Sequence, residues 1–154
     1  MAQPKILDDV MRMEKSPEPP EWKWSYTAKT GSLFAALDAI EQACKTWNID
    51  AALVSRARIV VEELFTNTIK YGYGGECDSS IRIHLAVRPR LTLVYGDDAP
   101  LFDPTHWKSE SDDAVLPDAR AEGRAGIAMV MGLCAAATYQ AQDGRNCLTL
   151  TFEP

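Results

Sequence analysis

The stretch Val60–Tyr73, VVEELFTNTIKYGY, places a carboxylate and a carboxamide one helical turn apart. At about 100° per residue, Glu63 and Asn67 are separated by roughly 40° around a helix. The buried arc of this helix is expected to consist of side chains at helical spacing, namely Leu53, Ala57, Val60, Val61, Leu64 and Thr68. Asn67 lies at the border of that arc and Glu63 just beyond it, so the pair can face a pocket instead of bulk water.

A polar pair in this position is compatible with two different roles. An asparagine oxygen can ligate a hard cation such as Mg²⁺, and a nearby carboxylate can accept a proton from an attacking hydroxyl. The simpler alternative is a solvated helix edge whose polar side chains take part in no chemistry. Spacing alone favours that simpler alternative, so the other motifs of the chain decide between the two.

The periodicity of apolar residues predicts the first elements of the fold. A half-buried strand is expected at residues 22–26, because tryptophan and tyrosine alternate there with polar residues. The next element is a helix with the apolar stripe Leu33, Leu37, Ile40, Cys44 and Trp47. Asp50 is expected to N-cap the following helix, which carries Glu63 and Asn67 and stops at Gly72.

Beyond Gly72 the pattern predicts two strands, at 81–87 and 91–95, joined by a turn. A helix is expected from Gly126 to Cys134, followed by two strands near 138–141 and 147–152 that pair across a turn at Asp143-Gly144. The complete order is one strand, two helices, two strands, a helix and two strands. It predicts an α+β fold, a two-layer α/β sandwich with helices packed on one face of a mixed β-sheet.

The chain of 154 residues is expected to form one domain preceded by an arm. Residues 1–20 contain four prolines among charged residues, which predicts a flexible N-terminal arm, and residues 21–154 are expected to form the domain. Residues 104–122 lack an apolar period. A loop of that length inside a compact domain is usually functional or disordered.

Composition limits the kinds of partner. The net charge of −6 and the lack of a basic stripe argue against binding to nucleic acid. The longest apolar run, residues 126–137, is shorter than the roughly 20 residues needed to cross a bilayer, and the N-terminus lacks a signal-peptide pattern. We therefore expect a cytoplasmic protein without a membrane partner. The four cysteines are widely spaced, so buried thiols are expected rather than a zinc site or disulfides.

Three further motifs follow the helix of Glu63 and Asn67. Asp97-Asp98-Ala99-Pro100 ends a strand, Gly123-Arg124-Ala125-Gly126 opens an apolar helix, and DGRNCLTL at 143–150 forms the last hairpin. From the residues alone, the aspartates can simply cap a turn. The glycines can mark a plain helix start, or a helix N-terminus whose free backbone N–H groups attract an anion.

Together, these motifs resemble those of the histidine-kinase-like ATPases with the Bergerat ATP-binding fold. Within them, the chain looks like the small anti-sigma regulatory factors that act as serine/threonine protein kinases, and the resemblance covers residues 22–153. The resemblance implies ATP and Mg²⁺ as cofactors. It also implies that Asn67 holds Mg²⁺ and that Glu63 is the catalytic residue, which orients or deprotonates the substrate serine.

At the adenine end, the resemblance implies that Asp97 accepts a hydrogen bond from the adenine amino group. Ala99 stands where the family usually has glycine, and its methyl group is expected to crowd the base. Thr149, on the last strand, resembles the threonine that helps hold the adenine through water.

At the phosphate end, the resemblance implies that Gly123 and Gly126 let the backbone approach the phosphates. Arg124 or Arg120 would add positive charge to the same site, and Lys70 could reach a phosphate. The glycine pattern is thinner than the family's usual one, because only two glycines remain.

The implied function is that of an ATP-dependent kinase of the partner-switching type. Its partners would be a sigma factor or comparable regulator and an anti-anti-sigma (STAS-type) antagonist, which it phosphorylates. The alternative is a non-catalytic regulatory binding module of the same fold with weak or lost nucleotide binding, which Ala99 and the reduced glycine pattern favour. A catalytic domain serving a two-component histidine kinase is disfavoured, because the sequence shows no dimerisation helix with a phosphoacceptor histidine. The oligomeric state stays open, a homodimer being one option.

Overall fold

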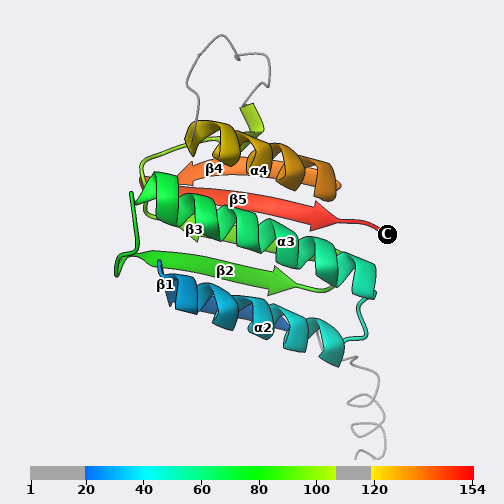
Figure 1. The fold of residues 1–154 in the computed structure, drawn as a ribbon. Coiled ribbons are helices and arrows are strands. Elements are labelled where there is room, and N and C mark those ends of the chain that lie inside the picture. Colours follow the sequence, from blue (N-terminus) through cyan, green and yellow to red (C-terminus); the bar gives the residue numbers. More distant parts are fainter. Residues whose placement is uncertain (1–19, 107–118) are drawn as a thin grey trace, which may run out of the picture.

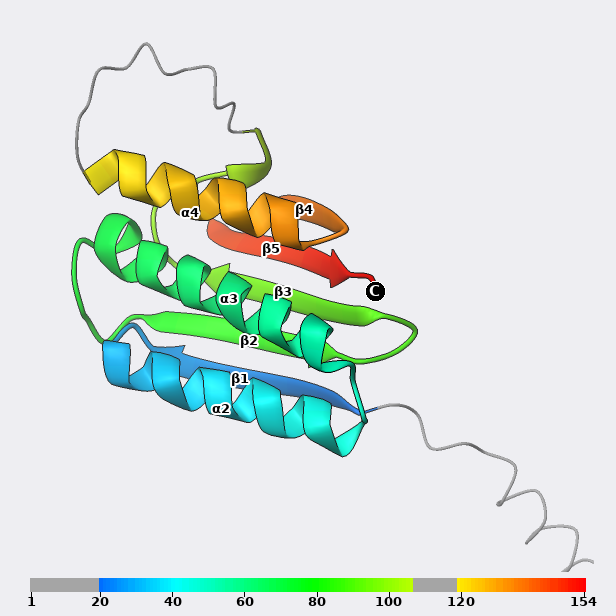
Figure 2. The same ribbon diagram turned by 45° about the vertical axis from the view of Figure 1, so that its right-hand side comes forward.

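The computed structural model describes residues 20–106 and 119–154 (Figure 1). The strands are β1 Glu21–Thr27, β2 Ser80–Ala86, β3 Leu91–Asp97, β4 Ala136–Gln142 and β5 Arg145–Phe152, and the helices are α2 Thr30–Thr46, α3 Ala51–Asn67 and α4 Ala119–Leu133, with the short helical turns η1 Thr68–Gly72 and η2 Pro104–His106. The three long helices lie side by side on one face of the sheet (Figures 1 and 2), which confirms the predicted two-layer α+β fold. The predicted arm, apart from residue 20, and residues 107–118 of the long loop lie outside the described residues.

The sheet differs from the prediction in one respect, because it is antiparallel and not mixed. Its strand order is β1-β2-β3-β5-β4, and each neighbouring pair runs antiparallel. The two consecutive helices after β1 return the chain to the end of the sheet where β1 finishes, so β2 runs back along β1. The single helix α4 makes β3 and β4 run in the same direction. The two are not neighbours, however, since β5 inserts between them.

Helix α3 follows the sequence pattern closely. The carboxylate of Asp50 caps it by accepting a hydrogen bond from the backbone N–H of Ala52 at 2.7 Å. The predicted arc is buried, whereas Glu63 and Asn67 are half-buried beside it. The π-helical turn η1 continues the helix to Gly72, where the pattern predicts its end.

Helix α4 begins earlier than the sequence pattern predicts. It starts at Ala119 and not near Gly126, so Gly123 and Gly126 lie inside the helix. The cause is the segment ARAE at 119–122, which is made of residues with high helix propensity. Inside a helix each backbone N–H is paired with the carbonyl four residues back, so the amides of these glycines are not free to bind an anion.

The hairpin of β4 and β5 brings the C-terminal strand into the middle of the sheet. Asp143 and Gly144 form its two-residue turn, with φ angles of 53° and 75°, a conformation that glycine and aspartate tolerate well. Leu148, Leu150 and Phe152 are buried toward the helices. Side chains alternate along a strand, so Asn146 lies on this same inner face and Thr149 on the opposite face.

The core between sheet and helices includes the fully buried Cys44. All four cysteines, each within the described residues, are free thiols. Among the helices that the structure describes, none combines the length and the apolar character required to cross a bilayer.

Candidate functional site

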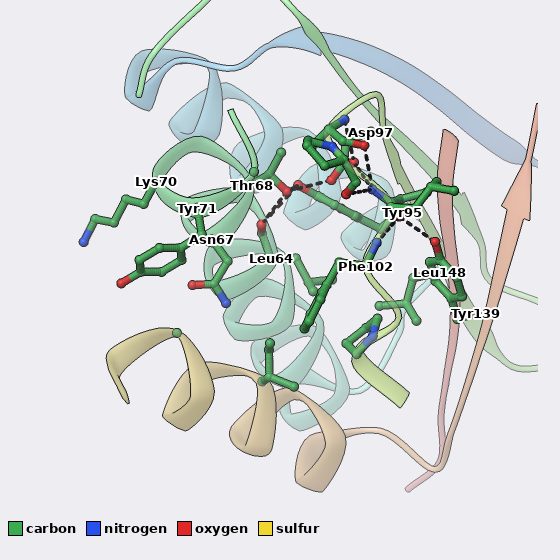
Figure 3. Close-up of a pocket in the computed structure, with 18 residues that line it drawn as sticks. Leu64, Asn67, Thr68, Lys70, Tyr71, Tyr95, Asp97, Phe102, Tyr139 and Leu148 are labelled. Carbon is green, nitrogen blue, oxygen red and sulfur yellow. Dashed lines mark hydrogen bonds between the residues drawn. The ribbon is translucent and has the colours of Figure 1, made fainter. Parts of the chain in front are cut away.

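A cavity of about 690 Å³ opens between α3, η1, α4 and the ends of β3 and β5 (Figure 3). Its walls are largely apolar and include Leu64, Ile127 and Leu148. Five residues singled out from the sequence line it: Asn67, Lys70, Asp97, Ala99 and Gly123. The structure therefore brings together motifs that are up to 56 residues apart in the chain (67 to 123).

The buried carboxylate of Asp97 is the most strongly anchored polar group of the cavity. Its Oδ2 accepts a hydrogen bond from Thr68 Oγ1 at 2.9 Å. Its Oδ1 accepts from the backbone N–H of Ala99 at 3.1 Å and from Asn146 Nδ2 at 2.8 Å. A carboxylate has about four lone-pair positions, so among the described residues one position stays free, on Oδ2.

A buried hydroxyl chain supports Asp97 from the helix side. Tyr95 Oη lies 2.6 Å from Thr68 Oγ1, and both lie close to the carbonyl oxygen of Leu64. Since the Thr68 proton is best directed to the charged Asp97, the Tyr95 hydroxyl donates to Thr68. Burial raises the pKa of Tyr95 well above its ordinary value, and the charge of Asp97 raises it further, although the hydrogen bond to Thr68 opposes them. Tyr95 therefore keeps its proton at neutral pH.

Asn67 and Glu63 both lie against α4, but only Asn67 lines the cavity. A Cβ added to Gly126 would overlap Oε2 of Glu63 and would lie 3.5 Å from Nδ2 of Asn67. The absence of a side chain at Gly126 therefore lets α4 approach this pair. Within the described residues, Nδ2 of Asn67 is buried without a hydrogen-bond partner.

Gly123, three residues before Gly126 in α4, has a similar packing role. A Cβ added to Gly123 would lie 2.8 Å from the ring of Tyr71. The expectation that Gly123 and Gly126 precede the helix with free amides is wrong for this structure, because both face side chains of α3 and η1 from within α4. The side chain of Arg124 lies outside the described residues.

Ala99 lines the cavity, and its methyl group packs against the end of η1. It is buried, and its Cβ lies 2.8 Å from the position of a Cβ added to Gly72. The methyl group therefore fits against the bare backbone at the end of η1. Lys70 is exposed, and it lies with Asn67 on the side of the cavity away from Asp97 (Figure 3).

The structure does not bring Thr149 to the cavity. It is on the outer face of β5, opposite Thr138 of β4 and Val94 of β3. The inward polar residue of this strand is Asn146, which the family resemblance did not single out. Its signal was present in the strand alternation, since the inward positions Leu148, Leu150 and Phe152 lead back to Asn146.

The sequence of residues 26–152 matches the family model of the histidine kinase-like ATPase domain. The chain belongs to this family. No curated protein sequence matches the chain significantly.

A solved structure has the same fold as this histidine kinase-like ATPase domain. It is the crystal structure of the RsbU and RsbW domains of Rv1364c from Mycobacterium tuberculosis, with a TM-score of 0.59 and 15% sequence identity. The similarity covers 87% of this chain but 32% of the other, so the chain spans about a third of that relative's length.

The cavity has groups that suit a nucleotide, as a histidine kinase-like ATPase domain requires. Apolar walls can enclose a base, and the free position on Asp97 can accept one donor from it. Among the described residues, the buried Nδ2 of Asn67 has no hydrogen-bond partner, so this N–H group is available to a ligand. An amide oxygen is a ligand type that Mg²⁺ accepts, so the donor set fits ATP with Mg²⁺.

Proposed function

We propose that this domain binds ATP with Mg²⁺ and acts as a serine/threonine protein kinase in a partner-switching pathway. The observation that carries the proposal is Asp97, a buried carboxylate that three donors hold at an apolar cavity with one acceptor position left. The amino group of adenine supplies one matching donor. Leu64, Ile127 and Leu148 would contact the faces of the base.

The opposite side of the cavity would hold the phosphates. Bound Mg²⁺ would neutralise phosphate charge and so assist displacement at phosphorus. In this proposal the oxygen of Asn67 ligates the metal, and the exposed ammonium group of Lys70 turns toward the phosphates. The glycine amides take no part while they are inside α4.

Glu63 would act on the substrate hydroxyl. It neighbours Asn67 at the boundary between α3 and α4, half-buried and against Gly126. There its carboxylate would orient the serine hydroxyl and accept its proton as the oxygen attacks the terminal phosphate. Phosphate transfer depends mainly on positioning and charge neutralisation. A single well-placed carboxylate is therefore enough to handle the proton of the serine hydroxyl.

The proposed partners come from the sequence resemblance. They are a sigma factor or comparable regulator, which the domain would bind, and a STAS-type antagonist, which it would phosphorylate on serine. The proposed location is the cytoplasm, because transcription factors of this kind act there. The fold shared with a structure that contains an RsbW domain supports this assignment.

One observation favours a second function, that of a regulatory binding module with weak or lost nucleotide binding. Gly123 and Gly126 pack against Tyr71 and Glu63 and do not present free amides. If α4 keeps this position, the phosphates lose the backbone donors that the resemblance implies.

Calorimetric titration with ATP and MgCl₂ tests the two functions. We expect binding by the wild type and a loss of about tenfold or more in Asp97→Asn, because the amide cannot replace the charged acceptor. Asp98→Asn is the matched control, since this exposed carboxylate pairs with Arg82 and Arg145 and does not line the cavity. A folded wild type without ATP binding would favour the regulatory module. Binding without phosphate transfer to a serine-containing antagonist would reject the kinase.

A further inference from the structure

Asn146 connects the cavity's carboxylate to the loop that follows β3. It is the register partner of Asp97 across β3 and β5. Its Nδ2 donates to Asp97 Oδ1 at 2.8 Å and lies 3.2 Å from the carbonyl oxygens of Ala99 and Pro100. Its Oδ1 accepts from the Tyr139 hydroxyl at 2.6 Å and from the backbone N–H of Phe102 at 3.0 Å. One amide thus engages five groups, four in the stretch 97–102 and one on β4.

These partners fix the orientation of the amide. The three groups around Nδ2 are acceptors, and the two groups around Oδ1 are donors. A flipped amide would place an oxygen among three oxygens and an NH₂ group against two donors. Asn146 can therefore present only its N–H groups to Asp97.

This orientation determines which oxygen of Asp97 can meet a ligand. The hydrogen bonds from Asn146 and Ala99 saturate Oδ1, whereas Oδ2 has Thr68 alone among the described residues. Two donors on one oxygen also hold the carboxylate plane in place. Asn146, which itself lines the cavity, thus determines which oxygen of Asp97 is left for a ligand.

We propose that Asn146 is a positioning residue which, through Asp97, sets the base preference of the cavity. The inference rests on the proposed nucleotide binding. A fixed, charged carboxylate accepts a hydrogen bond from the 6-amino group of adenine. It repels the 6-oxo group of hypoxanthine, which is otherwise similar in shape. A displaced carboxylate loses this discrimination, because water can then bridge it to either group.

The test compares Asn146→Asp with Asn146→Ala by calorimetry, using adenosine and inosine diphosphates with MgCl₂. Asn146→Asp places a second carboxyl against Oδ1 of Asp97, and two adjacent carboxyls share one proton with one pKa raised. Below that raised pKa the new carboxyl donates to Asp97 as the amide did. Above it the two charges repel, and Asp97 is displaced.

The expected results differ between the two variants. Relative to the wild type at the same pH, Asn146→Asp should lose about tenfold in affinity for adenosine diphosphate near pH 8.5 and regain it toward about pH 5.5. Asn146→Ala should lose affinity throughout this range, because it has no proton to gain. Its preference for adenosine over inosine diphosphate should narrow by about tenfold.

Other charged groups near Asp97 do not produce this profile. The Arg82 hydrogen bond lowers the pKa of Asp98, and burial raises the pKa of Tyr73 and Tyr139. His106 pairs with Asp103 in the wild type and the variants alike, so the comparison at each pH removes its effect. Gln140→Glu is the matched control, because it makes the same chemical change on an exposed residue of β4 that does not line the cavity. It should follow the wild type.

Two measurements keep this inference separate from the proposed function. If the wild type binds adenosine diphosphate and both Asn146 variants bind it equally well with unchanged preference, the inference is overturned and nucleotide binding stands. If the wild type binds no nucleotide, the proposed function fails and the base preference with it, and the ¹³C titration of the Asp97 carboxyl then decides whether Asn146 positions Asp97. An Asp97 titration in Asn146→Asp identical to that of the wild type overturns it. Should that variant not fold, the same comparison is made with Asn146→Ala.

Discussion

The Cβ of Ala99 lies 2.8 Å from the position that a Cβ on Gly72 would occupy. The two residues belong to different motifs, one at the end of η1 and the other in the loop after β3. An alanine at position 99 is therefore accommodated by a glycine at position 72. The pair shows why the departure from glycine at Ala99 need not narrow the cavity, since the added methyl group points at backbone.

We expect Gly72→Ala to reduce the free energy of unfolding by about 1–3 kcal/mol, because its methyl group would collide with that of Ala99. In an Ala99→Gly background the same substitution should cost much less. A double-mutant cycle in urea should give a coupling of about 1 kcal/mol or more. Gly31→Ala is the control, since a Cβ there meets nothing within 4 Å. Equal effects of Gly72→Ala in both backgrounds would contradict the packing relationship.

The same pair yields a prediction about ATP. Ala99→Gly should leave ATP affinity close to that of the wild type while lowering stability, because glycine adds freedom to the unfolded chain. The resemblance alone predicts the opposite, namely tighter binding once the methyl group is removed. Calorimetry on both proteins distinguishes these outcomes. Tighter binding would show that the base contacts the methyl group after all.

Two glycines of α4 offer a matched comparison. Gly126→Ala should displace the Glu63 carboxylate, a flexible group, and so lower phosphate transfer far more than stability. At Gly132 a Cβ meets nothing within 4 Å, so Gly132→Ala should raise the unfolding free energy by roughly 0.5–1 kcal/mol and leave transfer unchanged. Phosphate transfer and urea unfolding should be measured on both variants. Full transfer activity in Gly126→Ala would show that phosphate transfer does not depend on where the Glu63 carboxylate lies in this structure.

The polar pair of α3 should separate binding from chemistry. Asn67→Ala should remove Mg²⁺-dependent nucleotide binding, because the amide oxygen would ligate the metal already in the bound complex, before phosphate transfer begins. Glu63→Ala should bind nucleotide almost normally and lose phosphate transfer by about 10²–10⁴-fold. Glu62→Ala, at an exposed neighbouring position, is the control. Equal transfer rates in Glu63→Ala and the wild type would eliminate the proposed base.

A pH-dependent prediction concerns the core. Burial raises the pKa of the Cys44 thiol to about 11, above the ordinary cysteine value of 9.0. The folded state therefore holds this proton more tightly than the unfolded chain, so the associated stability is complete below about pH 9 and is lost as pH rises through about 11. In urea unfolding at several pH values, the stability of Cys44→Ala should decline less over this window than that of the wild type. Equal losses of stability in Cys44→Ala and the wild type over this pH range would contradict the role of Cys44.

The sequence predicted helix α3 well because local chemistry determines it. Asp50 is a strong N-cap, Gly72 is a natural stop, and the apolar spacing places Asn67 at the border of the buried arc. These signals all lie within one helix and need no knowledge of its neighbours.

The errors arose where distant parts of the chain decide the structure. Whether a sheet is mixed depends on where β5 inserts, and nothing local to β3 or β4 records that. At Thr149 the family resemblance overrode a usable signal, since the inward positions of the strand pointed to Asn146. At α4 the glycines suggested a helix start, although residues 119–122 already favour helix.

The insertion of β5 between β3 and β4 also affects how the protein is made. Strand β5, one of the two strands that pair with β3 beside Asp97, is the last of the five to leave the ribosome, so a nascent chain that ends in α4 has β3 with an unpaired edge. Asn146 and the acceptor geometry of Asp97 then do not yet exist. A growing chain can bury its helices early, but the cavity is assembled only once β5 has been made, and until then the open edge of β3 is prone to misassociation.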